Sequence, residues 1–379
     1  MTADEELSKG CRFIEEGKFD EARKIFLKMA RKSIPEAQFN LALMYQDGKG
    51  VPRSMKKAAK WYTKAADNGM DEALLNLGCM YLLGNGVPTS EKKAFDLVQK
   101  AADNGYGKAQ IQLGVMYEFG SGTVQSYEKA FGWYNAAAQQ DIPEAHVALA
   151  RLYASGNGVR KSETKTISLL ERASSMGYGE AQEILGTLYY YGEGVPRSPA
   201  KAAELFRLAA EQNYPSAAFN LGIMYSEGDG VEQSDEQAFV WYTAASNMGH
   251  SDAQFNLGVA YDFGIGCKKD LMEAAKWYSM SASQGNSDAL CNLGDMYENG
   301  RGVEKDFDKA MTLYKASADL GNDLAQCSIG DMYRKGEGVP QSDQEAEKWY
   351  RTSAEKGCKE AINELVKMGK DVSGYNTED

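Results

Sequence analysis

Two glycines, Gly48 and Gly50, lie in the segment YQDGKGVPRSMKKAAKWY just ahead of a cluster of basic residues. Glycine-rich turns that lead into a helix can bind phosphate, because exposed backbone N–H groups and the helix dipole attract anions. The same two glycines return every 36 residues, as far as Gly336 and Gly338, whereas a nucleotide loop occurs once. No Gly-Lys pair is followed by Ser or Thr, as a P-loop requires. We therefore expect a repeated structural turn here and no cofactor.

A second pattern with possible chemistry is S-x-x-K, the nucleophile signature of penicillin-binding proteins. It occurs five times, at Ser54 and Lys57, Ser90 and Lys93, Ser126 and Lys129, Ser162 and Lys165, and Ser198 and Lys201. The serine positions follow the same 36-residue step, and the other repeats have Ser or Asp there, which are good helix N-caps. We expect capping serines with exposed lysines, and we keep an S-x-x-K hydrolase as an alternative function.

Histidine and cysteine give little sign of a catalytic or metal site. The two histidines, His146 and His250, lie far apart in the sequence and have no partner pattern for a triad or a zinc site. The six cysteines are too sparse for a disulfide scaffold and form no C-x-x-C pair. We predict no catalytic residue and no metal ligand.

Charge and hydropathy restrict the partners and the compartment. Acidic residues outnumber basic ones by 54 to 42, and the resulting net charge of -12 repels a phosphate backbone, so nucleic acid is not an expected partner. The N-terminal MTADEELSKG lacks the basic start and apolar stretch of a signal peptide, and no apolar run approaches membrane-spanning length. Together with the sparse cysteines, this favours a cytoplasmic protein that does not insert into membranes.

The elements that carry these residues repeat along almost the whole chain. Alanine recurs at every 36th residue from Ala37 to Ala361, and tyrosine does so from Tyr45 to Tyr333. Each unit predicts two short helices, because apolar residues recur at helical spacing on both sides of the glycine turn. One such helix pair cannot bury its apolar face alone, so the units must stack. All five tryptophans fall in one position of the second helix, where other repeats have leucine, which predicts a core position.

The repeated pattern A-x-x-x-L-G-x-M-Y-x-x-G-x-G-V, followed by A-x-x-W-Y-x-x-A-A-x-x-G, resembles the Sel-one-like repeat, a relative of the tetratricopeptide repeat with a longer turn. Residues 217–249, AAFNLGIMYSEGDGVEQSDEQAFVWYTAASNMG, match it at nearly every signature position. The resemblance implies an all-α fold, a right-handed α-α superhelix or solenoid. Its nine 36-residue helix-turn-helix repeats would span residues 37–360. Residues 1–36 resemble a tetratricopeptide-like capping repeat, and residues 361–379 would form a capping helix and a flexible tail.

In tetratricopeptide-like solenoids the first helices line a concave groove that holds an extended or helical peptide, and the resemblance implies the same here. The residues expected on this face are polar amides and apolar side chains. They are Asn40, Leu75, Asn76, Phe119, Tyr190, Tyr191, Phe219, Asn220, Phe255, Asn256, Phe263 and Asn292. A ladder of amides could pair with the backbone of a bound chain, or it could bind neighbouring helices and hold the stack in register. The apolar strip could bind a partner or be partly buried by superhelical curvature.

These features favour a non-enzymatic adaptor or scaffold that binds a protein or peptide in the groove. Acidic residues near the C-terminal end of the face, Asp295, Glu298 and Asp331, suggest a ligand with an apolar portion and a basic end. We expect a monomer. A self-associating structural protein, in which the apolar strip joins copies of the chain, is the main alternative to the adaptor.

Overall fold

The computed structural model describes residues 2–375, and all regular structure in that range is helical. It contains 21 helices, with no strand among the described residues. The two N-terminal helices, α1 (Ala3–Glu15) and α2 (Phe19–Ala30), precede nine helix pairs, and α21 (Lys359–Lys367) follows them. The prediction of an all-α solenoid of 36-residue helix pairs is therefore confirmed.

We number the repeats 1 to 9 by their helix pairs. The first helices are α3 (Pro35–Asp47), α5 (Asp71–Leu83), α7 (Gly107–Phe119), α9 (Pro143–Ser155), α11 (Gly179–Tyr191), α13 (Pro215–Glu227), α15 (Ser251–Phe263), α17 (Ser287–Asn299) and α19 (Asp323–Lys335). The second helices are α4 (Met55–Asp67), α6 (Glu91–Asp103), α8 (Tyr127–Ala138), α10 (Glu163–Ser175), α12 (Pro199–Ala210), α14 (Asp235–Asn247), α16 (Leu271–Ala282), α18 (Phe307–Asp319) and α20 (Asp343–Ala354).

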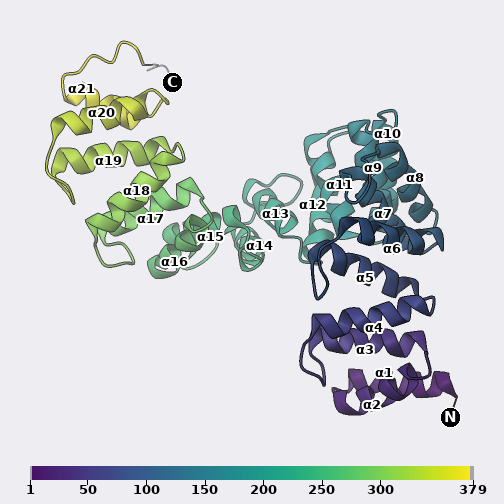
Figure 1. Cartoon of the computed structure of the whole chain (residues 1–379). Helices are drawn as coiled ribbons and strands as arrows, with labels where there is room; N and C mark the ends of the chain where they lie inside the picture. The colour runs from purple at the N-terminus through teal and green to yellow at the C-terminus, as the bar shows by residue number, and fades with distance from the viewer. Residues whose placement is uncertain (1, 376–379) are drawn as a thin grey trace. The chain divides into compact units, whose positions relative to one another are not determined.

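The chain forms two compact units, and the division between them falls within the sequence of α11. Unit 1 comprises residues 1–181 and unit 2 comprises residues 182–379. In unit 1 each helix from α1 to α10 packs on the next, and in unit 2 the same holds from α12 to α21 (Figure 1). Consecutive helices are therefore the packing partners within each unit.

The glycine turn is a helix end followed by a contact between repeats. Gly264 ends α15 in the left-handed conformation, with its N–H on the carbonyl of Ala260. Gly266, two residues on, also has positive φ, and a Cβ there would overlap the backbone of Asp235, the first residue of the preceding second helix. The second glycine is therefore needed for close packing between repeats as well as for its φ. Its backbone faces protein, which leaves no room for a phosphate.

The second helices begin as the serine positions predict, with one exception. In eight of the nine repeats the Ser or Asp side chain accepts a hydrogen bond from a backbone N–H of the first turn. Ser198 makes no such bond. Pro199 follows it at the first helical position and restricts the backbone of Ser198, whose ψ of 85° is lower than in the other repeats. The expectation of nine side-chain caps is wrong at this one position.

The core of each repeat is a large side chain held between small ones. Tyr62 and Tyr278 on the second helices are fully buried, their equivalents are buried, and alanines such as Ala58 and Ala274 lie against them. The tryptophan position, one residue earlier, is less deeply buried: among the five tryptophans only Trp277 counts as buried. The tryptophans were predicted to be core, and most of them instead cover its edge, because adjacent helix residues point in different directions.

Buried glutamines join neighbouring repeats in a way that the sequence analysis did not predict. In repeat 7, Gln254 donates from Nε2 to the carbonyl of Ser246 over 3.2 Å, and its Oε1 accepts from Gln284 over 2.8 Å. The same side-chain pair joins Gln38 to Asn68, Gln110 to Gln140, and Gln212 to Gln182. Each side-chain pair holds the end of a second helix against the first helix of its own repeat. The bond from Gln254 to the carbonyl of Ser246 joins repeat 7 to repeat 6.

Candidate functional site

The contacts of the S-x-x-K serines and lysines do not suit nucleophilic catalysis. The Oγ of Ser126 accepts from the backbone N–H of Lys129 over 3.3 Å, as an N-cap does. The Lys129 ammonium lies over the ring of Tyr117, 5.1 Å from its centre, and Lys57, Lys93, Lys165 and Lys201 lie over the equivalent tyrosines. Because the ammonium is engaged by an aromatic ring, it is not placed to activate the serine.

Four of the residues predicted for the groove lie in unit 1. Asn40 donates from Nδ2 to the carbonyl of Glu36 in its own helix, over 2.9 Å. Asn76 lies beside the Tyr62 hydroxyl, and Leu75 is half-buried against the core. Phe119, at the end of α7, is 71% exposed. Each therefore has a different environment.

The other predicted residues lie in unit 2, and several pack on buried aromatic rings. Phe255 lies 5.9 Å from Tyr278, measured between ring centres, and Phe219 lies 6.0 Å from Tyr242. Phe219 also stacks on His250, with the ring centres 4.5 Å apart. These phenylalanines are half-buried, so part of the predicted strip is covered by the repeat itself.

Other apolar residues of the strip remain open to solvent. Tyr191 and Phe263, at the ends of α11 and α15, are each 65% exposed. Tyr190 is half-buried, with its ring 5.0 Å from that of Tyr191 in an edge-to-face arrangement. Exposed aromatic side chains are common at binding surfaces because they bury a large apolar area on contact.

The asparagines differ in whether a tyrosine of the preceding repeat lies beside them. Asn256 lies beside the Tyr242 hydroxyl, and Asn292 lies beside the Tyr278 hydroxyl. Asn220 follows a repeat that has Phe206 in place of the tyrosine. Its side-chain amide has no hydrogen bond to any residue that the structure describes. Asn256 and Asn292 therefore each lie beside a tyrosine of the preceding repeat, whereas Asn220 does not.

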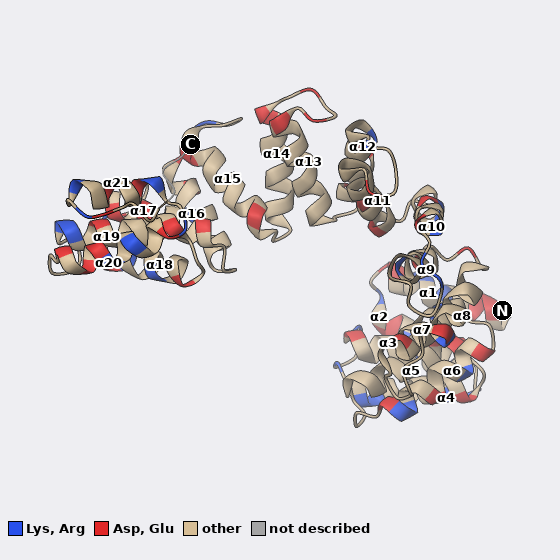
Figure 2. Cartoon of the chain, turned by 90° about the horizontal axis from the view of Figure 1, so that it is seen from above, with Lys and Arg blue, Asp and Glu red and all other residues tan. Residues whose placement is uncertain are grey.

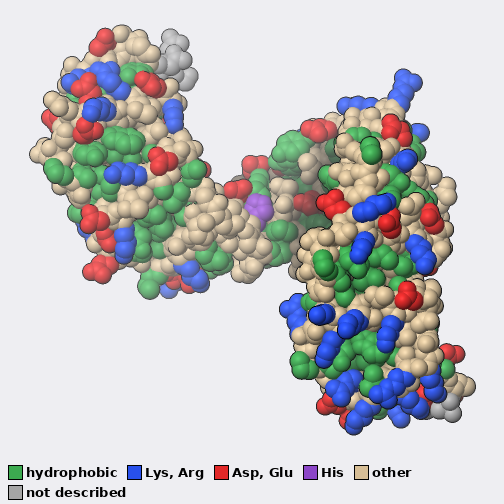
Figure 3. Space-filling model, viewed as in Figure 1, with side chains coloured by type: hydrophobic (Ala, Val, Ile, Leu, Met, Phe, Trp, Pro, Cys, Tyr) green, Lys and Arg blue, Asp and Glu red, His purple; other side chains and the backbone are tan. Residues whose placement is uncertain are grey.

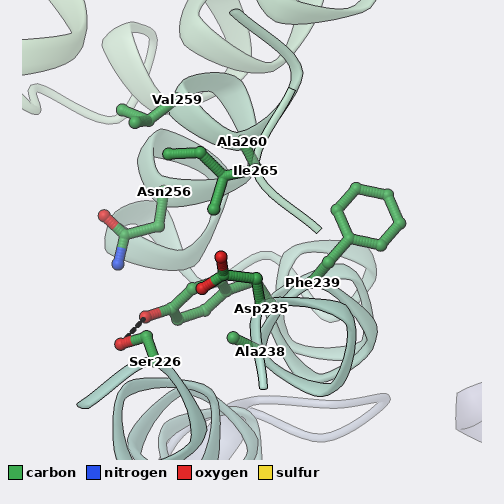
Figure 4. Close-up of a pocket in the computed structure, with 9 residues that line it drawn as sticks. Ser226, Asp235, Ala238, Phe239, Asn256, Val259, Ala260 and Ile265 are labelled. Atoms are coloured by element: carbon green, nitrogen blue, oxygen red, sulfur yellow. Dashed lines mark hydrogen bonds between the residues drawn. The ribbon is translucent and has the colours of Figure 1, made fainter. Parts of the chain in front are cut away.

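Two pockets of the same construction lie between consecutive repeats of unit 2. The first, of about 200 Å³, lies between repeats 6 and 7. Its floor is the Tyr242 ring, whose hydroxyl donates to the Oγ of Ser226 over 3.4 Å. Asn256, Val259 and Ile265 of repeat 7 line the side that faces this pair (Figure 4).

The second pocket, of about 140 Å³, lies between repeats 5 and 6. Phe206 occupies the position of Tyr242, while Asn220 and Ile223 occupy those of Asn256 and Val259. Tyr190 and Tyr191 add an aromatic wall. The structure thus brings Tyr190, Tyr191 and Asn220 together. Sequence reasoning missed the floors because these side chains come from second helices.

Charged groups lie at both pockets: the Asp235 carboxylate lines the first, and Glu227 accepts from the hydroxyl of Tyr190, which lines the second, over 3.5 Å. Burial raises the pKa of Tyr242, so its hydroxyl is neutral and acts as a donor. Another charged cluster lies in repeats 7 and 8, where Arg301 binds the buried carboxylate of Asp262 and donates to Asp295 over 2.6 Å. Apart from Asp235, the lining residues are uncharged, and they suit an apolar side chain with a backbone amide beside it.

Comparison with known proteins places this repeat in a family. The profile of the Sel1 repeat matches nine consecutive segments, from residues 35–70 to residues 323–358. The chain belongs to the Sel1 repeat family. No curated protein matches the chain significantly.

Two solved structures illustrate the likeness. One is c5321, a protective antigen of uropathogenic Escherichia coli with an SLR fold, which is 30% identical, with a TM-score of 0.71 over 98% of this chain and 81% of that chain. Another is a Sel1 repeat protein from Oxalobacter formigenes, 29% identical, with a TM-score of 0.57 over 82% of this chain and 89% of that one. Among the described residues of our Sel1 repeat protein, no helix has the length and hydropathy to span a membrane.

Proposed function

We propose that this Sel1 repeat protein is a non-enzymatic adaptor that binds a segment of another polypeptide across the two pockets of unit 2. The observation that carries the proposal is their equivalence: each has an aromatic floor, an aliphatic wall and an asparagine amide. A repeated pocket suits a repeated ligand, and a polypeptide presents side chains and backbone amides at regular intervals. Proteins of this family serve in general as scaffolds for protein interactions, which agrees with this role.

The expected ligand has two apolar side chains that enter neighbouring pockets. α13 and α15 both pack on α14. Helices in contact lie about 8–10 Å apart, so we place equivalent pockets roughly 10–15 Å apart. An extended chain advances about 3.3 Å per residue, which corresponds to a separation of about three to five residues. The amide of Asn220 would pair with the backbone between them.

The proposal also includes a basic end of the ligand, two capping segments of the chain and a cytoplasmic location. Glu298 and Asp331 each accept a tyrosine hydroxyl, from Tyr314 over 2.8 Å and from Tyr350 over 2.6 Å, and their negative charge would attract a basic end of the ligand. The terminal segments 1–36 and 361–379 would act as caps. The six free thiols agree with a cytoplasmic location.

The proposal is tested by selecting from a displayed library of random 12-residue peptides on the wild-type protein. Clones that also bind the Ile223→Arg, Val259→Arg double variant are removed. We expect the remaining sequences to share two apolar residues separated by three to five positions. Enrichment of the same sequences on both proteins, with both folded by circular dichroism, would argue against the pockets as the site. Light scattering over a concentration series tests self-association, which would appear as a rise in mass.

A further inference from the structure

A strongly basic surface lies at the N-terminal end of unit 1, far in sequence from the two pockets. Residues 23–64 contain eleven Lys and Arg but only two acidic residues, Glu36 and Asp47. The other 337 residues contain 31 basic and 52 acidic residues. A chain with a net charge of -12 therefore carries a short segment of opposite sign.

Most of the basic residues lie on α2 and α4, two helices that both pack on α3. Lys24 and Lys28 project from α2, and Lys56, Lys60 and Lys64 form a stripe along α4, all exposed. Figure 3 shows Lys and Arg side chains gathered at the end of unit 1 where Figure 1 places α1 to α4, and Figure 2 shows Lys and Arg, in blue, among the same helices. We call Lys24, Lys28, Arg31, Lys32, Lys56, Lys60 and Lys64 the basic surface.

Few of these charges are neutralised within the protein. Lys28 pairs with Glu6 at 2.6 Å, and Lys64 lies over the Trp61 ring, 4.4 Å from its centre. Among the described residues, Lys24, Lys56 and Lys60 form no ion pair. Asp20 and Glu21 lie at the start of α2, at the opposite end of that helix from Lys28. The basic surface therefore holds an excess of exposed positive charge.

The stripe on α4 is particular to the first repeat. The positions of Lys56, Lys60 and Lys64 become Lys92, Asp96 and Lys100 on α6, where Lys92 pairs with Asp96 at 2.8 Å. On α14 they are Glu236, Val240 and Ala244. Because the repeat fold forms equally well with these residues, the fold does not require the lysine stripe.

The details of the basic surface indicate which anion it suits. Lysines along α4 are four residues apart and rise about 6 Å each, close to the roughly 6.6 Å between alternate residues of an extended chain. No exposed large apolar side chain precedes Leu83 in the described chain, so the surface lacks the wedge that anchors an amphipathic helix in lipid. It also presents no exposed aromatic side chain for base stacking.

We propose that the basic surface is a second protein-binding site, and that it takes an acidic polypeptide segment in extended form with carboxylates at alternate positions. Each carboxylate meets one lysine of the stripe, and Lys24 and Lys28 on α2, which also packs on α3, are available to a longer ligand. This site is independent of the pockets in unit 2. The adaptor would then hold an apolar segment at one site and an acidic segment at the other.

The test uses a fluorescent 12-residue peptide with Glu at alternate positions, and a second peptide with Gln in place of each Glu. We expect the Glu peptide to bind the wild-type chain and the Gln peptide to bind at least tenfold more weakly. The Lys56→Glu, Lys60→Glu variant should bind the Glu peptide at least tenfold more weakly. The matched Lys92→Glu, Lys100→Glu variant should stay within about twofold. Both variants change exposed residues and spare Lys64 on Trp61, and circular dichroism checks their folding.

The other anionic partners are tested beside the peptide. Equal binding of the two peptides, equal affinity of the Lys56→Glu, Lys60→Glu variant, or absence of binding to the wild-type chain would overturn the proposal. Tighter binding to vesicles with 30% phosphatidylserine, or to a 20-base-pair DNA duplex, would overturn the acidic polypeptide as the partner. Weakening of the Glu peptide on raising NaCl from 50 to 300 mM would support an electrostatic contact.

Discussion

The hydroxyl of Tyr242 donates to the Oγ of Ser226 over 3.4 Å, and this pair forms the floor of the pocket between repeats 6 and 7. In the neighbouring pocket Phe206 takes the place of the tyrosine and offers no hydroxyl. The asparagine of each pocket therefore has a different neighbouring side chain. Asn256 lies beside a tyrosine hydroxyl, whereas Asn220 lies above a phenylalanine ring.

This difference predicts that the two asparagines respond differently to substitution. Asn220→Ala should leave the free energy of unfolding within about 0.5 kcal/mol of wild type, because no hydrogen bond to a described residue is lost. Asn256→Ala should lower it by about 1 kcal/mol, because it removes the amide that lies beside the Tyr242 hydroxyl. Urea unfolding measures both. Peptide affinity should fall in Asn220→Ala, and an equal loss of stability in the two variants would contradict the assignment.

The second glycine of the turn predicts a large effect of one methyl group. Gly266→Ala places a Cβ against the backbone of Asp235 at positive φ, which should lower the free energy of unfolding by about 2–4 kcal/mol. Gly249 also has positive φ but faces open space, so Gly249→Ala should lower it by about 1–2 kcal/mol. Urea unfolding compares the two variants. If they proved equally stable, the contact between repeats would not explain the glycine.

The buried ion pair between repeats 7 and 8 predicts an asymmetric result. Asp262 is buried and its carboxylate is held by Arg301, so Arg301→Ala leaves a buried charge without its partner. We expect a loss of about 3 kcal/mol in the free energy of unfolding. Arg207→Ala breaks an exposed pair with Glu211 and should change stability by less than about 0.5 kcal/mol. Thermal or urea unfolding measures both variants. A similar loss in the free energy of unfolding of Arg301→Ala and Arg207→Ala would contradict the importance of the Asp262 pair.

His146 predicts a loss of stability in mild acid. It is buried, neither ring nitrogen has a hydrogen bond partner among the described residues, and burial lowers its pKa. The unfolded chain binds the proton more tightly, so this contribution to stability is complete above the unfolded pKa of about 6.5 and declines as the pH falls below it. Urea unfolding of unit 1 between pH 8 and pH 5 measures the decline.

The control for that titration is His146→Gln, since other repeats have glutamine at this position. The variant should lose less stability between pH 8 and pH 5 than the wild type. His250, whose pKa is also lowered by burial, remains in both proteins and supplies a common background. An unchanged pH profile in His146→Gln would show that His146 does not cause the decline.

The sequence was enough to predict the repeat, the turn and all of the second-helix caps except Ser198, because each depends on residues a few positions apart. Gly264 ends one helix and Ser234 caps the start of another, and both positions recur at the 36-residue step. The glutamine pairs were missed although a signal existed: Gln38, Gln110, Gln182, Gln254 and Gln326 recur every 72 residues, in alternate repeats. Gln326 lacks a partner for its Oε1, because Lys356 stands where the other repeats have an amide.

The pockets could be predicted only in part. Helical periodicity assigned Tyr190 and Asn220 to one face of the first helices, and both line a pocket. It could not show which apolar residues of that face stay open, because this depends on how closely neighbouring repeats approach. Phe255 and Phe219 satisfy the same pattern as Phe263, yet they pack on tyrosine rings while Phe263 remains exposed.

The most direct test of the adaptor proposal is the dissociation constant of 12-residue peptides with two leucines in a Ser/Asn background. Their separation is varied from two to eight residues. We predict the tightest binding at three to five residues. We also predict at least a tenfold loss in Ile223→Arg and in Val259→Arg, and no change in Val240→Arg, an exposed position outside both pockets. Affinity that is independent of the separation, or equal in all three variants, would contradict binding across the two pockets.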